Sequence, residues 1–123
     1  MRDAAPHKVF QYYAICYAPN IAEERGITIA IVVLSYSQSS FMAFKRIPIW
    51  TPVLEFDSGA DPCFLDKFLR GFFESIQLDH GFVNEAMQWE SSIRLLYLGE
   101  FSTRDPEGLL SLLADAEFGV ETN

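Results

Sequence analysis

The sequence predicts an α+β fold, in which a mostly antiparallel sheet (a meander of three strands plus one later strand) has helices mainly on one face. Two observations carry this prediction. The N-terminal half holds three short apolar segments, and the C-terminal half holds two Asp-Pro pairs, each followed by apolar residues at helical spacing. The chain has 123 residues and no linker or low-complexity tract, so we expect a single domain over residues 1–123.

Three segments of the N-terminal half are typical of strands in a meander. Phe10–Tyr17 is apolar on both alternating faces, Ile27–Leu34 is β-branched at almost every position, and Phe41–Lys45 follows a polar turn. Because both faces of Ile27–Leu34 are apolar, we expect that strand at the centre of the sheet. Pro48 and Pro52 then break regular pairing and indicate a sheet edge or an extended crossover.

A helix is predicted to begin at the first Asp-Pro pair. Asp61 offers a capping oxygen, and Pro62 at the first helical position has no amide to leave unpaired. Apolar residues then recur at helical spacing, and we expect the stripe of Phe64, Phe68 and Phe72 to pack on the sheet.

The rest of the chain predicts a short helix, a strand and a last helix. A turn around His80 ends the first helix, and Phe82–Trp89 has a weaker helical pattern. Ser92–Leu98 alternates like a strand. Asp105-Pro106 then repeats the helix-start signal ahead of several leucines.

The formal net charge of the whole chain is −8, and most of the acidic side chains lie in its second half. Residues 1–53 carry five basic and three acidic side chains, whereas residues 54–123 carry four basic and fourteen acidic ones. Such a field repels phosphate backbones, so we expect no nucleic-acid binding. The acids either keep an apolar domain soluble or form a face for a basic partner.

No membrane association is expected. Apolar runs such as Ile29–Leu34 are far shorter than the ~20 residues of a membrane-spanning helix. No apolar stretch of signal-peptide length follows the first residues. We therefore expect a cytoplasmic location, which also suits two cysteines in the thiol form.

The segment Tyr17–Asn20, followed by Glu24 and by Ile27–Val33, resembles the opening of a bacterial family, domain of unknown function 3037. That opening is roughly Tyr-x-Pro-Asp, an acidic residue and Val-Asn-Val-Gly-Val-Val, and positions 28 and 30 depart from the family's Asn and Gly. Ser92–Leu98 and Asp105–Ala116 also look similar to the family, so the resemblance spans nearly the whole chain. It implies no established catalytic activity. Since members of the family are sometimes encoded near HipA-like kinases, the resemblance also makes such a kinase a candidate partner.

Charged residues offer two ligand-binding candidates. Arg94 lies inside an apolar strand, on the face of Leu96 and Leu98. A buried arginine needs a carboxylate or a ligand anion, whereas an arginine on an edge strand points to water, and both alternatives stay open. Glu55 and Asp57 share a face if the chain is extended there, where paired carboxylates hold magnesium or perform acid–base chemistry, or they are simply a solvated loop.

Thiols and imidazoles supply little material for catalysis. Cys63 lies in the first turn of a predicted helix, where a thiolate is stabilised, or else it is a small buried residue; Cys16 is expected in the core. His7 and His80 are the two histidines, which leaves little material for a metal site or a nucleophile–histidine pair; Asp79 and His80 are either one pair of a larger site or part of a solvated turn. We expect no metal and no cofactor.

Four aromatic residues are interface candidates or core fillers: Tyr12, Tyr13, Trp50 and Trp89. The two clear helices are expected to cover one sheet face, so the other apolar face must meet Ile47–Pro52, the short helix or a second copy.

We therefore expect a non-enzymatic protein-interaction module that acts as a homodimer or with a partner protein. The alternative is a small-molecule-binding or enzymatic domain whose pocket is built around Arg94 and an acidic residue.

Overall fold

Four antiparallel strands form one open sheet in the order β3-β2-β1-β4, in a computed structural model that describes residues 8–19, 26–35, 41–88 and 92–118. The elements in chain order are β1 (Lys8–Tyr17), β2 (Ile27–Leu34), β3 (Met42–Arg46), α1 (Thr51–Phe56), α2 (Pro62–Leu78), α3 (Phe82–Ala86), β4 (Ile93–Thr103) and α4 (Pro106–Glu117). The expected α+β class, with its three-stranded meander and one later strand, is confirmed. None of the described helices is both long and apolar enough to cross a membrane.

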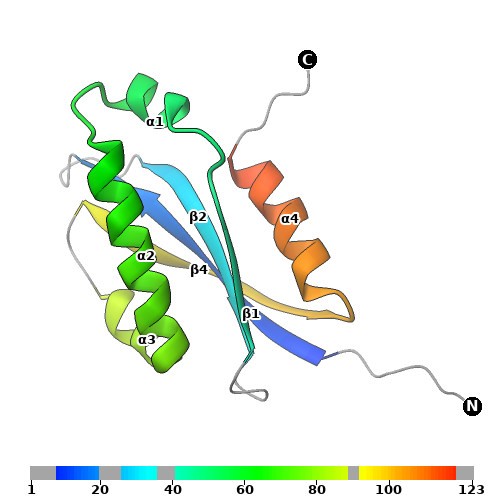
Figure 1. Cartoon of the computed structure of the whole chain (residues 1–123). Helices are drawn as coiled ribbons and strands as arrows, with labels where there is room; N and C mark the ends of the chain where they lie inside the picture. The colour runs from blue at the N-terminus through cyan, green and yellow to red at the C-terminus, as the bar shows by residue number, and fades with distance from the viewer. Residues whose placement is uncertain (1–7, 20–25, 36–40, 89–91, 119–123) are drawn as a thin grey trace, which may run out of the picture.

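Helices lie on both sides of this sheet (Figure 1). On one side, Phe44 of β3 stacks on Phe73 of α2. On the other side, the hydroxyl of Tyr12 in β1 donates a hydrogen bond to the carbonyl oxygen of Pro106 at the start of α4. Helices α2 and α3 thus share one face, whereas α4 covers the opposite face. The sequence predicts the two long helices on the same face, but they lie on opposite faces of the sheet. An uncovered apolar face is therefore no longer expected on this ground.

The core runs through the middle of the sheet on both faces. Every side chain from Ile29 to Leu34 in β2 is fully buried. The central position predicted for this strand is confirmed, because β2 pairs with β1 on one side and with β3 on the other. A strand covered on both faces can be apolar at every position without exposing apolar surface.

Helix α2 begins as predicted but turns a different stripe to the sheet. The Asp61 carboxylate accepts hydrogen bonds from the backbone N–H groups of Cys63 and Phe64. The buried residues of α2 are Leu65, Leu69, Phe72, Phe73 and Ile76. Phe68 is only half-buried, and Phe64 is 56% exposed. Successive helical residues are ~100° apart, so residues 64 and 68 lie beside the buried stripe at 65 and 69.

Two elements differ from the predicted boundaries. The edge predicted at Pro48 is found, because β3, which ends just before it, is the outermost strand. Pro52 instead lies in the first turn of α1, a helix that the sequence did not predict, where a missing amide costs nothing. Strand β4 continues five residues beyond the predicted end at Leu98. The β1–β4 register shifts between Tyr12 and Tyr13, opposite Gly99, and this bulge lets the strand continue. Glycine suits the position because its φ of +134° is rarely adopted by other residues.

The stability of the fold is expected to fall above pH 10. Burial, helped by the charge of Asp105, raises the pKa of Tyr12 from 10.0 to about 12. Between these values the unfolded chain loses a proton that the folded chain keeps, so the free energy of unfolding decreases as pH rises. Denaturant melts across this range should show the decrease, and Tyr12→Phe should reduce it. If Tyr12→Phe leaves the pH dependence of the unfolding free energy unchanged, Tyr12 is not its source. Burial also raises the pKa of Tyr17 to about 12, so Tyr17 accounts for the pH dependence that remains in Tyr12→Phe.

Candidate functional site at the edge of the sheet

Among the residues that the structure describes, strand β3 forms one edge of the sheet and has a neighbouring strand on one side only. It pairs with β2 without a register shift, and the N–H of Ile47 donates to the carbonyl oxygen of Ile29 at 2.8 Å. Backbone groups in an antiparallel pair point alternately toward and away from the neighbouring strand. The backbone N–H and C=O groups of Met42, Phe44 and Arg46 therefore point to the open edge.

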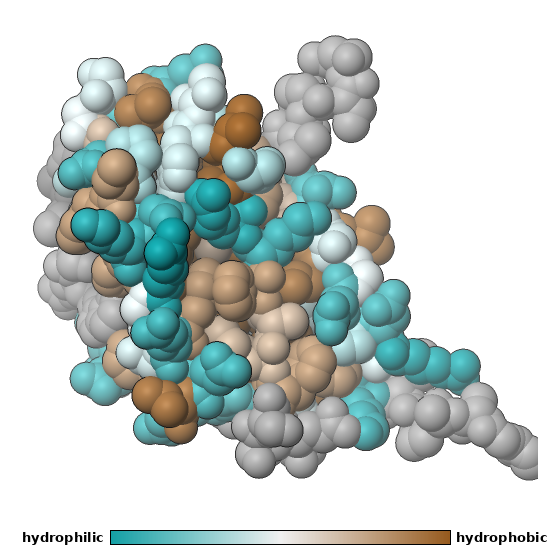
Figure 2. Space-filling view, viewed as in Figure 1, coloured by the Kyte–Doolittle hydropathy of each residue, from teal (hydrophilic) through white to brown (hydrophobic). Residues whose placement is uncertain are grey.

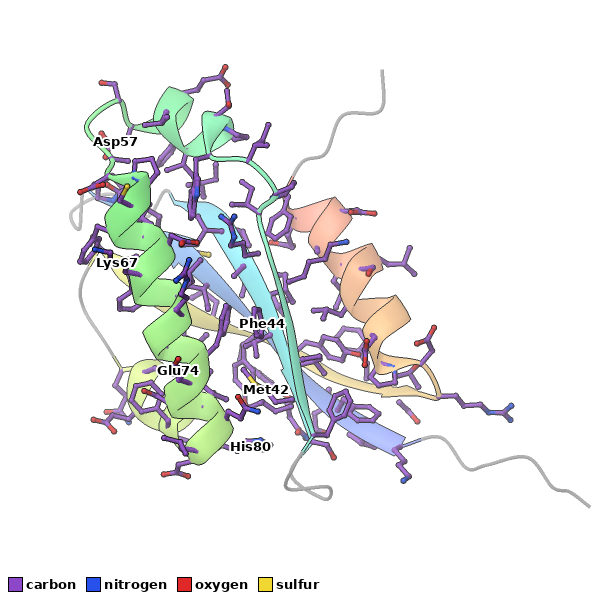
Figure 3. All side chains as sticks on the ribbon, viewed as in Figure 1. Met42, Phe44, Asp57, Lys67, Glu74 and His80 are labelled. Atoms are coloured by element: carbon purple, nitrogen blue, oxygen red, sulfur yellow. The ribbon has the colours of Figure 1, made fainter. Side chains whose placement is uncertain are left out.

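A groove of about 490 Å³ lies between this edge and α2. It is lined by Phe44, Arg46, Asp66, Leu69, Arg70, Phe73, Glu74 and Gln77. Figure 3 shows the labelled Phe44 and Met42 on β3, facing the part of α2 that carries Glu74. The same alternating β3 residues thus supply both the open backbone groups and the side chains on the groove side.

An apolar surface is exposed along this edge. Phe44 is 48% exposed although its ring stacks on Phe73, with centroids 3.7 Å apart and planes 18° apart. Figure 2 shows the apolar patch facing the viewer, between the hydrophilic ridge of α2 on the left and polar groups toward α4 on the right. Exposed aromatic rings with polar rims are enriched at protein–protein contacts.

Charge is distributed unevenly along the groove. At one end, Asp66 is shared by two arginines: its Oδ1 lies 3.7 Å from Arg46 Nε, and its Oδ2 lies 3.0 Å from Arg70 Nη2. The Arg46 guanidinium also lies 5.1 Å from the ring centroid of Trp50, a half-buried interface candidate. Two positive charges against one negative charge leave this end positive, and Glu74, two helical turns beyond Asp66, makes the other end negative.

Arg94 lies at a different place, on the α4 side of the edge strand β4. It is half-buried and is the cross-strand partner of Cys16. Cys16 Sγ lies 3.6 Å from Thr28 Oγ1, which donates to Glu117 Oε1 at 3.2 Å. Burial raises the pKa of the Cys16 thiol, while the Thr28 hydrogen bond and the charge of Arg94 oppose this rise.

An arginine and a carboxylate thus share one region of the α4 face, as the alternative function requires. Arg94 lines neither the β3 groove nor a more open hollow of about 420 Å³ on the α3 face. The lining of that hollow is Gln11, Tyr13, Asn84, Met87, Tyr97 and Glu100.

The proposed carboxylate pair is separated by its local structure. Glu55 is exposed on α1, and the extended segment that would align it with Asp57 is instead a helix followed by a turn. Asp57 accepts hydrogen bonds from the Tyr17 hydroxyl at 2.6 Å and from the N–H of Gly59 at 3.0 Å. It ties the end of α1 to the end of β1.

The remaining candidates fall at scattered positions. Cys63 is exposed at the start of α2, and Cys16 is buried, as expected. Tyr12 and Tyr13 are 0% and 4% exposed, so both are core residues, although Tyr13 also lines the hollow on the α3 face. Trp89 and His7 lie outside the described residues. Within the described part of the chain, no three metal-ligating side chains come together.

The residues of the β3 groove were missed by the sequence analysis. The spacing of Asp66, Arg70 and Glu74, each four residues apart, does predict one charged helical face, but nothing in it indicates that Phe44 lies alongside.

Compared with protein-family models, curated proteins and solved structures, the chain matches none of them.

Proposed function

We propose that this chain is a non-enzymatic protein-interaction module, acting as a homodimer or with a partner protein, and that it binds through the β3 edge and the adjoining groove. The observation that carries the proposal is Phe44, a half-exposed aromatic residue on a strand with an open backbone edge. In this mode of binding, an added strand gains main-chain hydrogen bonds, while neighbouring pockets select its side chains.

The opposite edge of the sheet is less suited to the same role. Strand β4 is interrupted at Gly99, where its pairing with β1 shifts register. Bulges of this kind bend an edge strand and make it a poor template for another strand. Strand β3 pairs in unbroken register and presents a regular edge.

The alternative, a ligand pocket around Arg94, has weaker support. Arg94 and Glu117 both lie near the buried thiol of Cys16, yet Arg94 lines neither the β3 groove nor the hollow on the α3 face. The resemblance to domain of unknown function 3037, the HipA-like kinase partner, the cytoplasmic location and the absence of nucleic-acid binding all stay predictions.

An edge-blocking substitution tests the proposed function. Tagged wild-type chain, Phe44→Asp and Leu112→Asp are used as baits in lysate of cells that express the chain, and retained proteins are identified by mass spectrometry. Leu112, which is 68% exposed on α4, is the matched control for adding a charge at an exposed apolar site. We expect one partner, or a second copy, to be retained by wild type and Leu112→Asp and lost with Phe44→Asp, because a charge opposes burial of that position.

The contrary result is equally clear. If folded Phe44→Asp, checked by circular dichroism, retains the same proteins as wild type, the β3 edge is not the contact surface. If wild type retains neither a partner nor a second copy, the interaction function itself is contradicted.

A further inference from the structure

We infer that the occupant of the β3 edge is a second copy of this chain, joined by a two-fold axis through Phe44; this inference rests on the proposed function. Met42, Phe44 and Arg46 direct their backbone groups to the open edge. In an antiparallel pair centred on Phe44, this residue faces the partner's Phe44, and Met42 faces the partner's Arg46. All three open residues then form hydrogen-bonded pairs, and the two sheets become continuous.

Charge complementarity supports this self-pairing. The Arg46 end of the groove is positive because Asp66 is shared with Arg70, and the Glu74 end is negative. In Figure 3 Glu74 is level with Met42, and Lys67 lies farther toward the start of α2. The two-fold axis reverses the direction of the partner strand, so the partner's Arg46 comes to the Glu74 end of this copy. Each positive end meets a negative end, and the contact occurs twice.

The remaining edge residues also tolerate this register. Lys45 lies opposite the partner's Ala43, so no two like charges are directly paired across the contact. Phe44, 48% exposed in one copy, is covered by the same residue of the other copy on the groove side. A strand with Phe at the axis and oppositely charged groups at the two ends is therefore complementary to itself.

Charge reversal in separate copies tests this contact. Light scattering at micromolar concentration in about 0.15 M salt, where charges more than ~8 Å apart are screened, measures the mass. Wild type is expected at twice the 14.0 kDa of one chain. Arg46→Glu and Glu74→Arg should each weaken self-association at least about tenfold, because each places like charges together twice.

Mixing the two variants provides the decisive measurement. In the mixed pair, the reversed charge at position 46 meets the reversed charge at position 74, and the second contact keeps its native charges. The double mass is therefore expected to return on mixing. If Arg46→Glu is unstable because it loses its own contact with Asp66, Glu74→Arg still tests the contact. The control is Lys67→Glu, which reverses an exposed charge on α2 outside the groove lining and is expected to stay dimeric.

The failures can be told apart. A wild-type chain that stays at 14.0 kDa, while its bait still retains a foreign partner in a Phe44-dependent manner, overturns the second copy and leaves the proposed function standing. A dimer unaffected by Phe44→Asp and by both charge reversals overturns this contact and the β3 edge together.

Discussion

Phe72→Ala is expected to lower the free energy of unfolding by about 3–5 kcal/mol, measured by denaturant melts. Phe72 is 4% exposed and lies in the buried stripe of α2. Its ring also contacts those of Phe68, Phe73 and Phe82. Removing it leaves a cavity between α2, α3 and the sheet, in addition to the lost burial of apolar surface.

Phe64→Ala is the matched control in the same helix. Phe64 is 56% exposed, so its truncation should cost no more than about 1 kcal/mol. Equal losses for the two variants would show that α2 packs through the Phe64 side, and the face assigned to this helix would then be wrong.

Leu110→Ala is expected to cost about 2–5 kcal/mol, which tests whether α4 covers the second face of the sheet. Leu110 is 4% exposed, and Ala114, one turn further along α4, is fully buried. If α4 were loosely attached, the strands beneath it would keep their stability without this leucine. Denaturant melts give the free energy directly.

Leu112→Ala is the control for this helix, because Leu112 is 68% exposed and has the same side chain. Its substitution should change the free energy of unfolding by no more than about 0.5 kcal/mol. A large loss for Leu112→Ala together with a small one for Leu110→Ala would mean that α4 presents its opposite face to the sheet.

Local signals predicted most of the secondary structure. Asp61 and Asp105 cap α2 and α4 as expected, because a carboxylate beside a proline satisfies free amides within a few residues of sequence. Helix α1 escaped prediction because its six residues are too few for a helical period. Strand β4 runs beyond its predicted end at Leu98, because the alternating pattern breaks at a bulge beside Gly99 and the strand continues past it.

The candidate site was beyond the reach of these local signals. Phe44 and Phe73 are distant in sequence and meet only because α2 packs beside β3. Arg46 and Asp66 become partners for the same reason. Tyr12 and Tyr13 were interface candidates because they are large aromatic residues, but their strand is covered from both sides and both are buried.

The presence of the four strands, the capped helices and the central place of Ile27–Leu34 could be predicted locally, because period, caps and β-branching act between near neighbours. The face that each helix covers depends on packing between distant segments, since an apolar stripe can pack on either side of a sheet that is apolar on both faces. That choice placed α4 opposite α2 and α2 beside β3. The groove exists because a helix at this edge covers Phe44 only in part, leaving its ring half-exposed beside an open strand.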